Sequence, residues 1–120
     1  MNIAICDDEK TCRDTVLAYL KPFDNEENAL RIFQFESGEA VLASYQTGAV
    51  FHLIFLDVEM KGLSGVETAK RIRERDKNAI FIFVTNHQKY VPDAFIVNAF
   101  QFLTKPLKQE LFNAEFARAL

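Results

Sequence analysis

The stretch Leu53-Ile54-Phe55-Leu56 contains four consecutive large apolar residues, and the acidic Asp57 follows it directly. Two similar apolar runs occur, at Ile3-Ala4-Ile5-Cys6 and at 79–84. Strands that are buried on both faces of a parallel sheet have this continuous apolar pattern, whereas strands with one solvated face alternate. The three runs therefore predict the central strands of a parallel sheet.

Extended and helical patterns alternate along the whole chain. Extended runs are expected at Asn2 to Cys6, Leu30 to Glu36, His52 to Asp57, Ala79 to Thr85 and Phe100 to Leu103. The second run alternates apolar and polar residues, which favours an edge strand. Helical spacing predicts a helix that stops before Pro22, and further helices that open at Ser37-Gly38, open at Ser64-Gly65-Val66-Glu67, and span Tyr90 to Val97 and Leu107 to Ala119. This alternation predicts an α/β, doubly wound parallel sheet with helices on both faces.

Length, composition and charge limit the class of protein. The 120 residues, 49% apolar and 26% charged, predict one globular domain over residues 1–120. A net charge of −3 disfavours binding of nucleic acid or anionic lipid through this domain itself. The longest apolar run, 79–84, is too short to span a membrane, and no secretory signal precedes Asp7, so a cytoplasmic protein is expected.

Polar side chains follow four of the predicted strands at the point where each strand ends. These residues are Asp7 and Asp8, Asp57, Thr85 and Lys105. Ligands of open α/β sheets bind outside the carboxyl ends of the strands. We therefore expect these five side chains, which are spread over most of the sequence, to converge on one edge of the sheet.

The residue types at this edge indicate a chemistry. Three neighbouring carboxylates repel one another unless cations offset them, and Lys105 together with one Mg²⁺ would balance Asp7, Asp8 and Asp57. Asp57 follows a central strand, and an ionised carboxylate can attack a phosphoryl group to form an aspartyl phosphate. Lys105 and the Thr85 hydroxyl can then bind phosphoryl oxygens. The pattern predicts a magnesium-dependent phosphoryl acceptor.

These residues resemble the receiver domain of two-component response regulators. The resemblance rests on Cys6-Asp7-Asp8-Glu9, on Phe55-Leu56-Asp57-Val58-Glu59-Met60 followed by Gly62-Leu63-Ser64-Gly65, on Phe83-Val84-Thr85 and on Lys105-Pro106. It covers essentially the whole chain. It implies a five-stranded (βα)5 fold with strand order 2-1-3-4-5, as in flavodoxin-like proteins.

The resemblance also implies roles for individual residues. Asp57 would accept a phosphoryl group from a sensor histidine kinase, and Lys105 would contact it. Asp8, Asp57 and the backbone carbonyl of Glu59 would bind Mg²⁺, with Asp7 contributing directly or through water. Thr85 and Phe102 would form the switch pair. Phosphorylation would promote a homodimer. Such a protein catalyses its own phosphorylation and dephosphorylation but is not a turnover enzyme.

Two further stretches resemble a subfamily whose receivers precede a LytTR-type DNA-binding domain. They are 84–90, which begins Val84-Thr85-Asn86-His87, and Ala94-Phe95-Ile96-Val97-Asn98-Ala99-Phe100. Control of transcription is then expected through an output domain that this chain lacks, and DNA contact only through that domain. Two positions depart from the family pattern. Phe102 stands where the switch residue is often Tyr. Pro92, in the fourth predicted helix, is expected to alter the face that relatives use to dimerise.

Three other classes of protein fit the sequence less well. A haloacid-dehalogenase-type phosphatase also uses an Asp nucleophile with Mg²⁺, but it needs a second Asp two residues later, where this chain has Glu59, and it needs a longer chain. A flavin-binding module needs a hydroxyl-rich phosphate loop, where this chain has three acidic residues. The acidic residues at the strand ends, Asp7, Asp8 and Asp57, argue against a protein-interaction domain that is never phosphorylated.

Overall fold

The computed structural model describes residues 1–86 and 101–120. The fourth helix predicted for 90–97, together with Pro92, lies outside the described residues. Five strands form one sheet: β1 (Asn2–Cys6), β2 (Arg31–Phe35), β3 (Leu53–Leu56), β4 (Ile80–Thr85) and β5 (Gln101–Thr104). All neighbouring strands are parallel, and their order is β2-β1-β3-β4-β5, which confirms the expected doubly wound topology.

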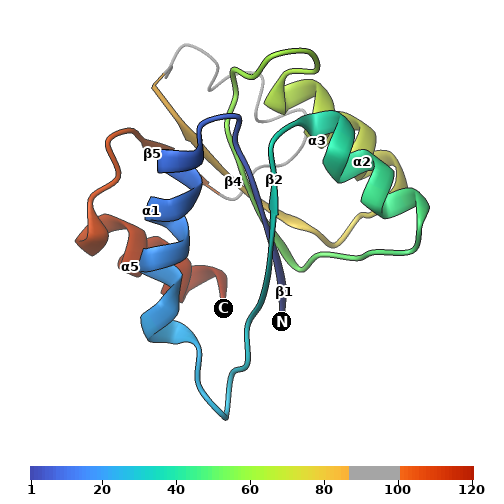
Figure 1. Ribbon diagram of the computed structural model, residues 1–120. Coiled ribbons are helices and arrows are strands. Elements are labelled where there is room, and N and C mark those ends of the chain that lie inside the picture. The colour runs from blue at the N-terminus through green and yellow to red at the C-terminus, as the bar shows by residue number, and fades with distance from the viewer. Residues whose placement is uncertain (87–100) are drawn as a thin grey trace.

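Helices cover both faces of the sheet (Figure 1). They are α1 (Lys10–Leu20), α2 (Gly38–Gln46), α3 (Gly65–Arg75) and α5 (Gln109–Ala119), and a short 3-10 turn (Lys21–Phe23) follows α1. The side chains of α1 and α5 pack with one face of the sheet, and those of α2 and α3 with the other. None of the helices in the described residues has the length and apolar character needed to cross a membrane.

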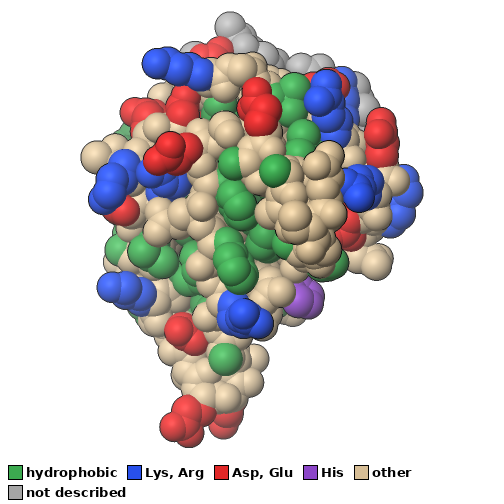
Figure 2. Space-filling model, turned by 45° about the vertical axis from the view of Figure 1, so that its right-hand side comes forward, with side chains coloured by type: hydrophobic (Ala, Val, Ile, Leu, Met, Phe, Trp, Pro, Cys, Tyr) green, Lys and Arg blue, Asp and Glu red, His purple; other side chains and the backbone are tan. Residues whose placement is uncertain are grey.

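The apolar runs form the centre of the sheet, as predicted. Every residue of β3 is at most 1% exposed, because its side chains enter the two cores alternately. Strand β2 pairs only with β1 and is largely exposed, which confirms its position at the edge. Phe33 on β2 is 38% exposed, and apolar side chains are visible across one face of the molecule (Figure 2).

The start of α3 agrees with the sequence prediction, whereas the start of the last helix differs from it. The Ser64 hydroxyl accepts a hydrogen bond from the Glu67 amide at 3.1 Å, and the Glu67 carboxylate lies 3.5 Å from Arg71 Nε, four residues later. The last helix begins at Gln109, two residues later than expected. Leu111 of this helix is 50% exposed. Phe112 of the same helix is buried, because packing against the sheet sets the orientation of α5.

Gly65 brings the first turn of α3 against the end of β3. Its amide donates a hydrogen bond to the Val58 carbonyl at 2.8 Å. A Cβ atom at this position would lie 1.8 Å from the Asp57 backbone oxygen, which is far inside contact distance. A residue without a side chain is therefore required where α3 meets the backbone of Asp57.

Candidate functional site

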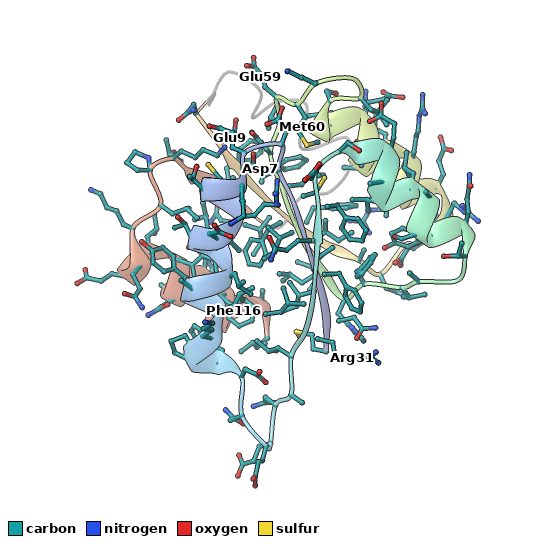
Figure 3. All side chains as sticks on the ribbon, viewed as in Figure 1. Asp7, Glu9, Arg31, Glu59, Met60 and Phe116 are labelled. Carbon is teal, nitrogen blue, oxygen red and sulfur yellow. The ribbon has the colours of Figure 1, made fainter. Side chains whose placement is uncertain are left out.

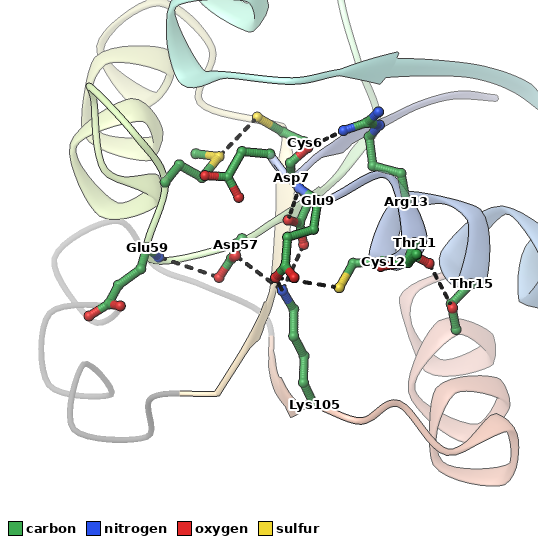
Figure 4. Close-up of polar contacts among 12 residues, drawn as sticks. Cys6, Asp7, Glu9, Thr11, Cys12, Arg13, Thr15, Asp57, Glu59 and Lys105 are labelled. Carbon is green, nitrogen blue, oxygen red and sulfur yellow. Dashed lines mark hydrogen bonds and ion pairs between the residues drawn. The ribbon is translucent and has the colours of Figure 1, made fainter.

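The ends of β1, β3 and β5 bring three charged side chains into contact. Lys105 Nζ lies 2.9 Å from Asp7 Oδ2 and 3.1 Å from Asp57 Oδ2 (Figure 4). Figure 3 shows Asp7, Glu9, Glu59 and Met60 at this end of the sheet, whereas Arg31 lies at the opposite end. The predicted convergence of the strand ends is therefore present for these residues.

Backbone hydrogen bonds extend the sheet just past the strands and fix these residues in place. The Asp7 amide donates to the Phe35 carbonyl at 3.1 Å, the Asp57 amide to the Cys6 carbonyl at 3.0 Å, and the Lys105 amide to the Thr85 carbonyl at 3.0 Å. Each charged residue is thus tied to the neighbouring strand. These hydrogen bonds to the sheet determine the spacing of the three charges.

Burial and mutual repulsion govern the charges of this cluster. Asp7 is 4% exposed and Asp57 is 5% exposed. Burial, and then the charge of Asp7, raise the pKa of Asp57 above its ordinary value, although Lys105 partly opposes them. Burial alone would lower the pKa of Lys105, but its bonds and charge interactions with Asp7 and Asp57 outweigh burial and raise it. One buried ammonium is therefore shared between two buried carboxylates.

Asp8 lies at the exposed rim of the cluster. Its Oδ2 accepts a hydrogen bond from the Lys61 amide at 3.2 Å, which ties the segment after β3 to the end of β1. On the buried side, Asp57 Oδ1 accepts from the Glu59 amide at 3.3 Å. Figure 4 shows the Glu59 carboxylate pointing away from Asp57, so Glu59 does not present a general acid to this site.

Carboxylate oxygens of Asp7, Asp8, Glu9 and Asp57 all lie within 4.8 Å of one another. Hard oxygen ligands of this kind, with two or more carboxylates, suit a divalent ion such as Mg²⁺. The cluster also has an excess of negative charge, since the only ammonium that contacts it in the described residues belongs to Lys105. The donor set therefore fits the predicted cation.

Two further charged residues, Glu9 within the cluster and Arg13 beside it, were not predicted as site residues. Glu9 Oε1 lies 3.4 Å from Lys105 Nζ. Its position in the sequence, directly after Asp7 and Asp8, could have indicated that it belongs to the site. Arg13, 6% exposed, donates from Nη1 to the Asp7 carbonyl at 2.6 Å. Arg13 lies at helical spacing with the buried Val16, so an arginine on an apolar helix face was the signal in that case.

The expected switch pair lies on one face of the sheet. Phe83 pairs in register with Phe102, and Thr85 with Thr104, so Thr85 and Phe102 extend from the same face. Thr85 is buried at the end of β4. The half-buried Phe102 stacks on Phe83, with ring centroids 5.1 Å apart and an interplanar angle of 24°.

Neither cysteine belongs to a disulfide or carries a reactive thiolate. Cys6 is buried, and burial raises its pKa to about 12. Cys12 is partly exposed and lines a pocket of about 460 Å³ between α1 and the segment after β5, together with Glu9, Tyr19 and Lys105. The pKa of Cys12 is also raised, chiefly by burial. The acidic cluster thus opens beside a surface pocket.

The sequence is similar to curated regulators over nearly its full length. It is 33% identical to the sensory transduction protein LytT of Oceanobacillus iheyensis over 120 residues, covering 98% of this chain and 47% of that protein. It is 34% identical to LytT of Bacillus subtilis over 110 residues, covering 92% of this chain and 44% of that protein. The chain therefore spans about half the length of these relatives.

Solved structures with the same fold include receiver domains that carry a beryllofluoride group. The BeF3-activated receiver domain of DrrB superposes with a TM-score of 0.82 at 28% identity, over 98% of this chain and 95% of that one. TrrA of Thermotoga maritima, in complex with Mg²⁺ and BeF, superposes with a TM-score of 0.84 at 26% identity, over 99% of this chain and 98% of that one. The family model described as "Response regulator receiver domain" matches residues 3–116. By sequence and by fold, the chain belongs to the receiver domains of two-component response regulators.

Proposed function

We propose that Asp57 is the phosphoryl acceptor and that a sensor histidine kinase is the donor. The observation that carries this proposal is the buried Asp57 carboxylate at the end of β3, 3.1 Å from the Lys105 ammonium and within the acidic cluster. One Asp57 oxygen attacks phosphorus, and an O–P bond forms as the N–P bond to the kinase histidine breaks. The histidine leaves as neutral imidazole once its nitrogen takes up a proton.

The surrounding residues stabilise the charge of the transferred group. Lys105 contacts one phosphoryl oxygen as a point charge, and the Thr85 hydroxyl donates to another. Asp7, Asp8, Asp57 and the Glu59 backbone carbonyl would hold Mg²⁺, which would supply positive charge to offset that of the phosphoryl oxygens. The complex of the similar TrrA with Mg²⁺ and BeF supports this assignment.

Phosphorylation changes the protein once per signal, so the domain is a phosphoryl acceptor and not a turnover enzyme. It catalyses its own phosphorylation and, by attack of water on the aspartyl phosphate, its own dephosphorylation. Thr85 moves toward the phosphoryl group, and Phe102 follows it into the space that Thr85 leaves. Because Phe102 has no hydroxyl, packing alone, now on Phe83, holds its ring in either position.

The proposed output lies beyond residues 1–120, which form the receiver domain. The LytT proteins to which the chain is similar are about twice as long, and this supports a LytTR-type DNA-binding segment that controls transcription. DNA is bound through that segment and not through the receiver. Histidine kinases form phosphohistidine from ATP, so the receiver must meet the kinase in the compartment that holds ATP. We therefore place the protein in the cytoplasm.

The first test measures phosphorylation directly. Incubation with acetyl phosphate and Mg²⁺ is expected to add about 80 Da to the intact mass, the size of one phosphoryl group. EDTA is expected to abolish the adduct, and Asp57→Asn is expected to remove it because the amide is not a nucleophile here. Glu27→Gln, which changes an exposed acid in the loop before β2, is the control and should be labelled like the wild type. An undiminished adduct on Asp57→Asn would contradict the assignment.

The second test measures assembly. Beryllofluoride with Mg²⁺ mimics the aspartyl phosphate, and it is expected to shift the domain from monomer to dimer in size-exclusion chromatography with light scattering. The shift should be absent in Asp57→Asn, which serves as the matched control for nonspecific fluoride effects. A dimer that forms equally in both proteins would show that association is independent of the phosphorylation site.

A further inference from the structure

Glu9 differs from the other two carboxylates that contact Lys105. The side chains of Asp7 and Asp57 are 6% and 7% exposed, whereas the Glu9 side chain is 59% exposed. Glu9 Oε1 lies 3.4 Å from Lys105 Nζ, and Glu9 also lines the pocket beside the cluster. The Glu9 carboxylate therefore covers the Lys105 ammonium on the side that faces solvent.

The contact is not explained by a structural role in α1. Glu9 occupies the position before the first turn of α1, but its side chain makes no capping hydrogen bond. Its Oε1 accepts a long hydrogen bond of 3.8 Å from the Cys12 thiol, which an amide oxygen can also accept. Its backbone is already fixed, because the Glu9 amide donates to Asp7 Oδ1 at 2.9 Å. Replacing the carboxylate by the isosteric amide would thus leave the start of the helix intact.

The Glu9 side chain adds one negative charge to the acidic cluster. Asp7, Asp8 and Asp57 are balanced by Lys105 and one Mg²⁺, so Glu9 leaves the metal-loaded cluster with one excess negative charge. The nearby Arg13 does not cancel it, because its guanidinium is bonded to the Asp7 carbonyl and lies 3.7 Å from Glu36. A phosphoryl group that enters from solvent, itself an anion, meets this charge before it reaches Lys105.

We infer that Glu9 is a specificity-determining residue of this receiver, one that discriminates against small free phosphoryl donors in proportion to their negative charge. This inference rests on the proposed phosphorylation of Asp57. Glu9 acts in two ways: it repels the incoming anion, and it occupies the solvent side of the lysine that the phosphoryl group must contact. Adventitious phosphorylation by metabolites such as acyl phosphates is thereby slowed.

The test compares two donors that differ in charge, with Glu9→Gln against wild type. Near pH 7, acetyl phosphate is a dianion and phosphoramidate carries a net single negative charge. A unit charge about 6 Å from a dianion in water-like surroundings changes a rate roughly tenfold, and about threefold for a monoanion. Initial rates of labelling, measured by intact mass at saturating Mg²⁺, are therefore expected to rise about tenfold with acetyl phosphate and about threefold with phosphoramidate. Both gains should shrink as KCl rises from about 50 to 500 mM.

Glu27→Gln is the matched control, because Glu27 is also an exposed glutamate but lies in the loop before β2, outside the cluster; its labelling rates should equal those of the wild type. Equal rates for Glu9→Gln and wild type, or the same gain with both donors, would overturn the inference. So would a loss of affinity for Mn²⁺ in place of Mg²⁺, measured by electron paramagnetic resonance, that is far larger than the roughly tenfold expected from removing one unit charge about 6 Å from a divalent ion, because Glu9 would then be a metal ligand. Absence of labelling by either donor in both wild type and Glu9→Gln would instead contradict the proposed phosphorylation of Asp57, because removing Glu9 can only favour these donors.

Discussion

Lys105→Met is expected to lower the stability of the metal-free protein by about 3 kcal/mol, the usual loss when one partner of a buried ion pair is removed. Asp7 and Asp57 are both buried, and Lys105 is the cation within bonding distance of each. Without it, the two carboxylates repel one another at low dielectric. Thermal unfolding in EDTA should show a fall in Tm of roughly 10 °C.

The lysine and the proposed metal compensate the same carboxylates, so Mg²⁺ should recover much of the stability lost in Lys105→Met. The raised pKa of Lys105 in the folded state also means that protonated Lys105 stabilises the fold. This stabilisation is complete below the ordinary lysine pKa and is lost as pH rises through the folded-state pKa. Lys10→Met is the control, since Lys10 forms an exposed pair with Asp14 and its removal should cost below about 1 kcal/mol. A metal-free Lys105→Met protein as stable as wild type would contradict the argument.

Gly65→Ala is expected to cost about 3 kcal/mol or more and to disrupt the acidic cluster with it. The added Cβ would lie 1.8 Å from the Asp57 oxygen, 2.7 Å from the Asp57 carbonyl carbon and 3.0 Å from Val58 Cα. All three are backbone atoms, which cannot rotate away. Either α3 moves off the sheet or the segment that follows Asp57 is displaced.

Urea denaturation gives the loss of stability, and Mn²⁺ binding under conditions where the variant is still folded gives the effect on the cluster. Gly48→Ala is the control, because Gly48 has φ of +97° but nothing lies within 4 Å of the position that an added Cβ would take. That variant should lose only the 1–2 kcal/mol or so of a left-handed backbone and should bind Mn²⁺ like the wild type. A Gly65→Ala protein with unchanged stability and metal affinity would show that the close approach is easily relaxed.

Much of the fold could be predicted from local patterns. The apolar runs at 3–6, 53–56 and 79–84 identify buried strands because only a strand covered on both faces is apolar at every position. Alternation at 31–36 indicates the edge strand for the same reason. The buried face of the last helix was harder to predict. Leu111 and Phe112 are both apolar and adjacent, and only the packing of α5 on the sheet decides which of them is buried.

The candidate site, too, could be predicted only in part from the sequence. Asp7, Asp57 and Lys105 were expected to meet because parallel strands end at one edge, and the structure places both carboxylates within 3.1 Å of the lysine nitrogen. The contact of Glu9 with Lys105 joins residues that are 96 positions apart in the sequence. Such a contact depends on the register of β1 and β5 across the sheet, and no local pattern encodes it.

The sequence by itself determined the order of the elements, the family and which residue types stand at the strand ends, because these follow from periodicity and from motifs within a few residues. Only the tertiary structure decided how the charges are shared. It buries Asp7 and Asp57 with one ammonium between them, and it leaves Glu9 at the mouth of the cluster. The physical reason is that burial and Coulomb energy depend on distances between atoms of different strands, and those distances exist only once the sheet has formed.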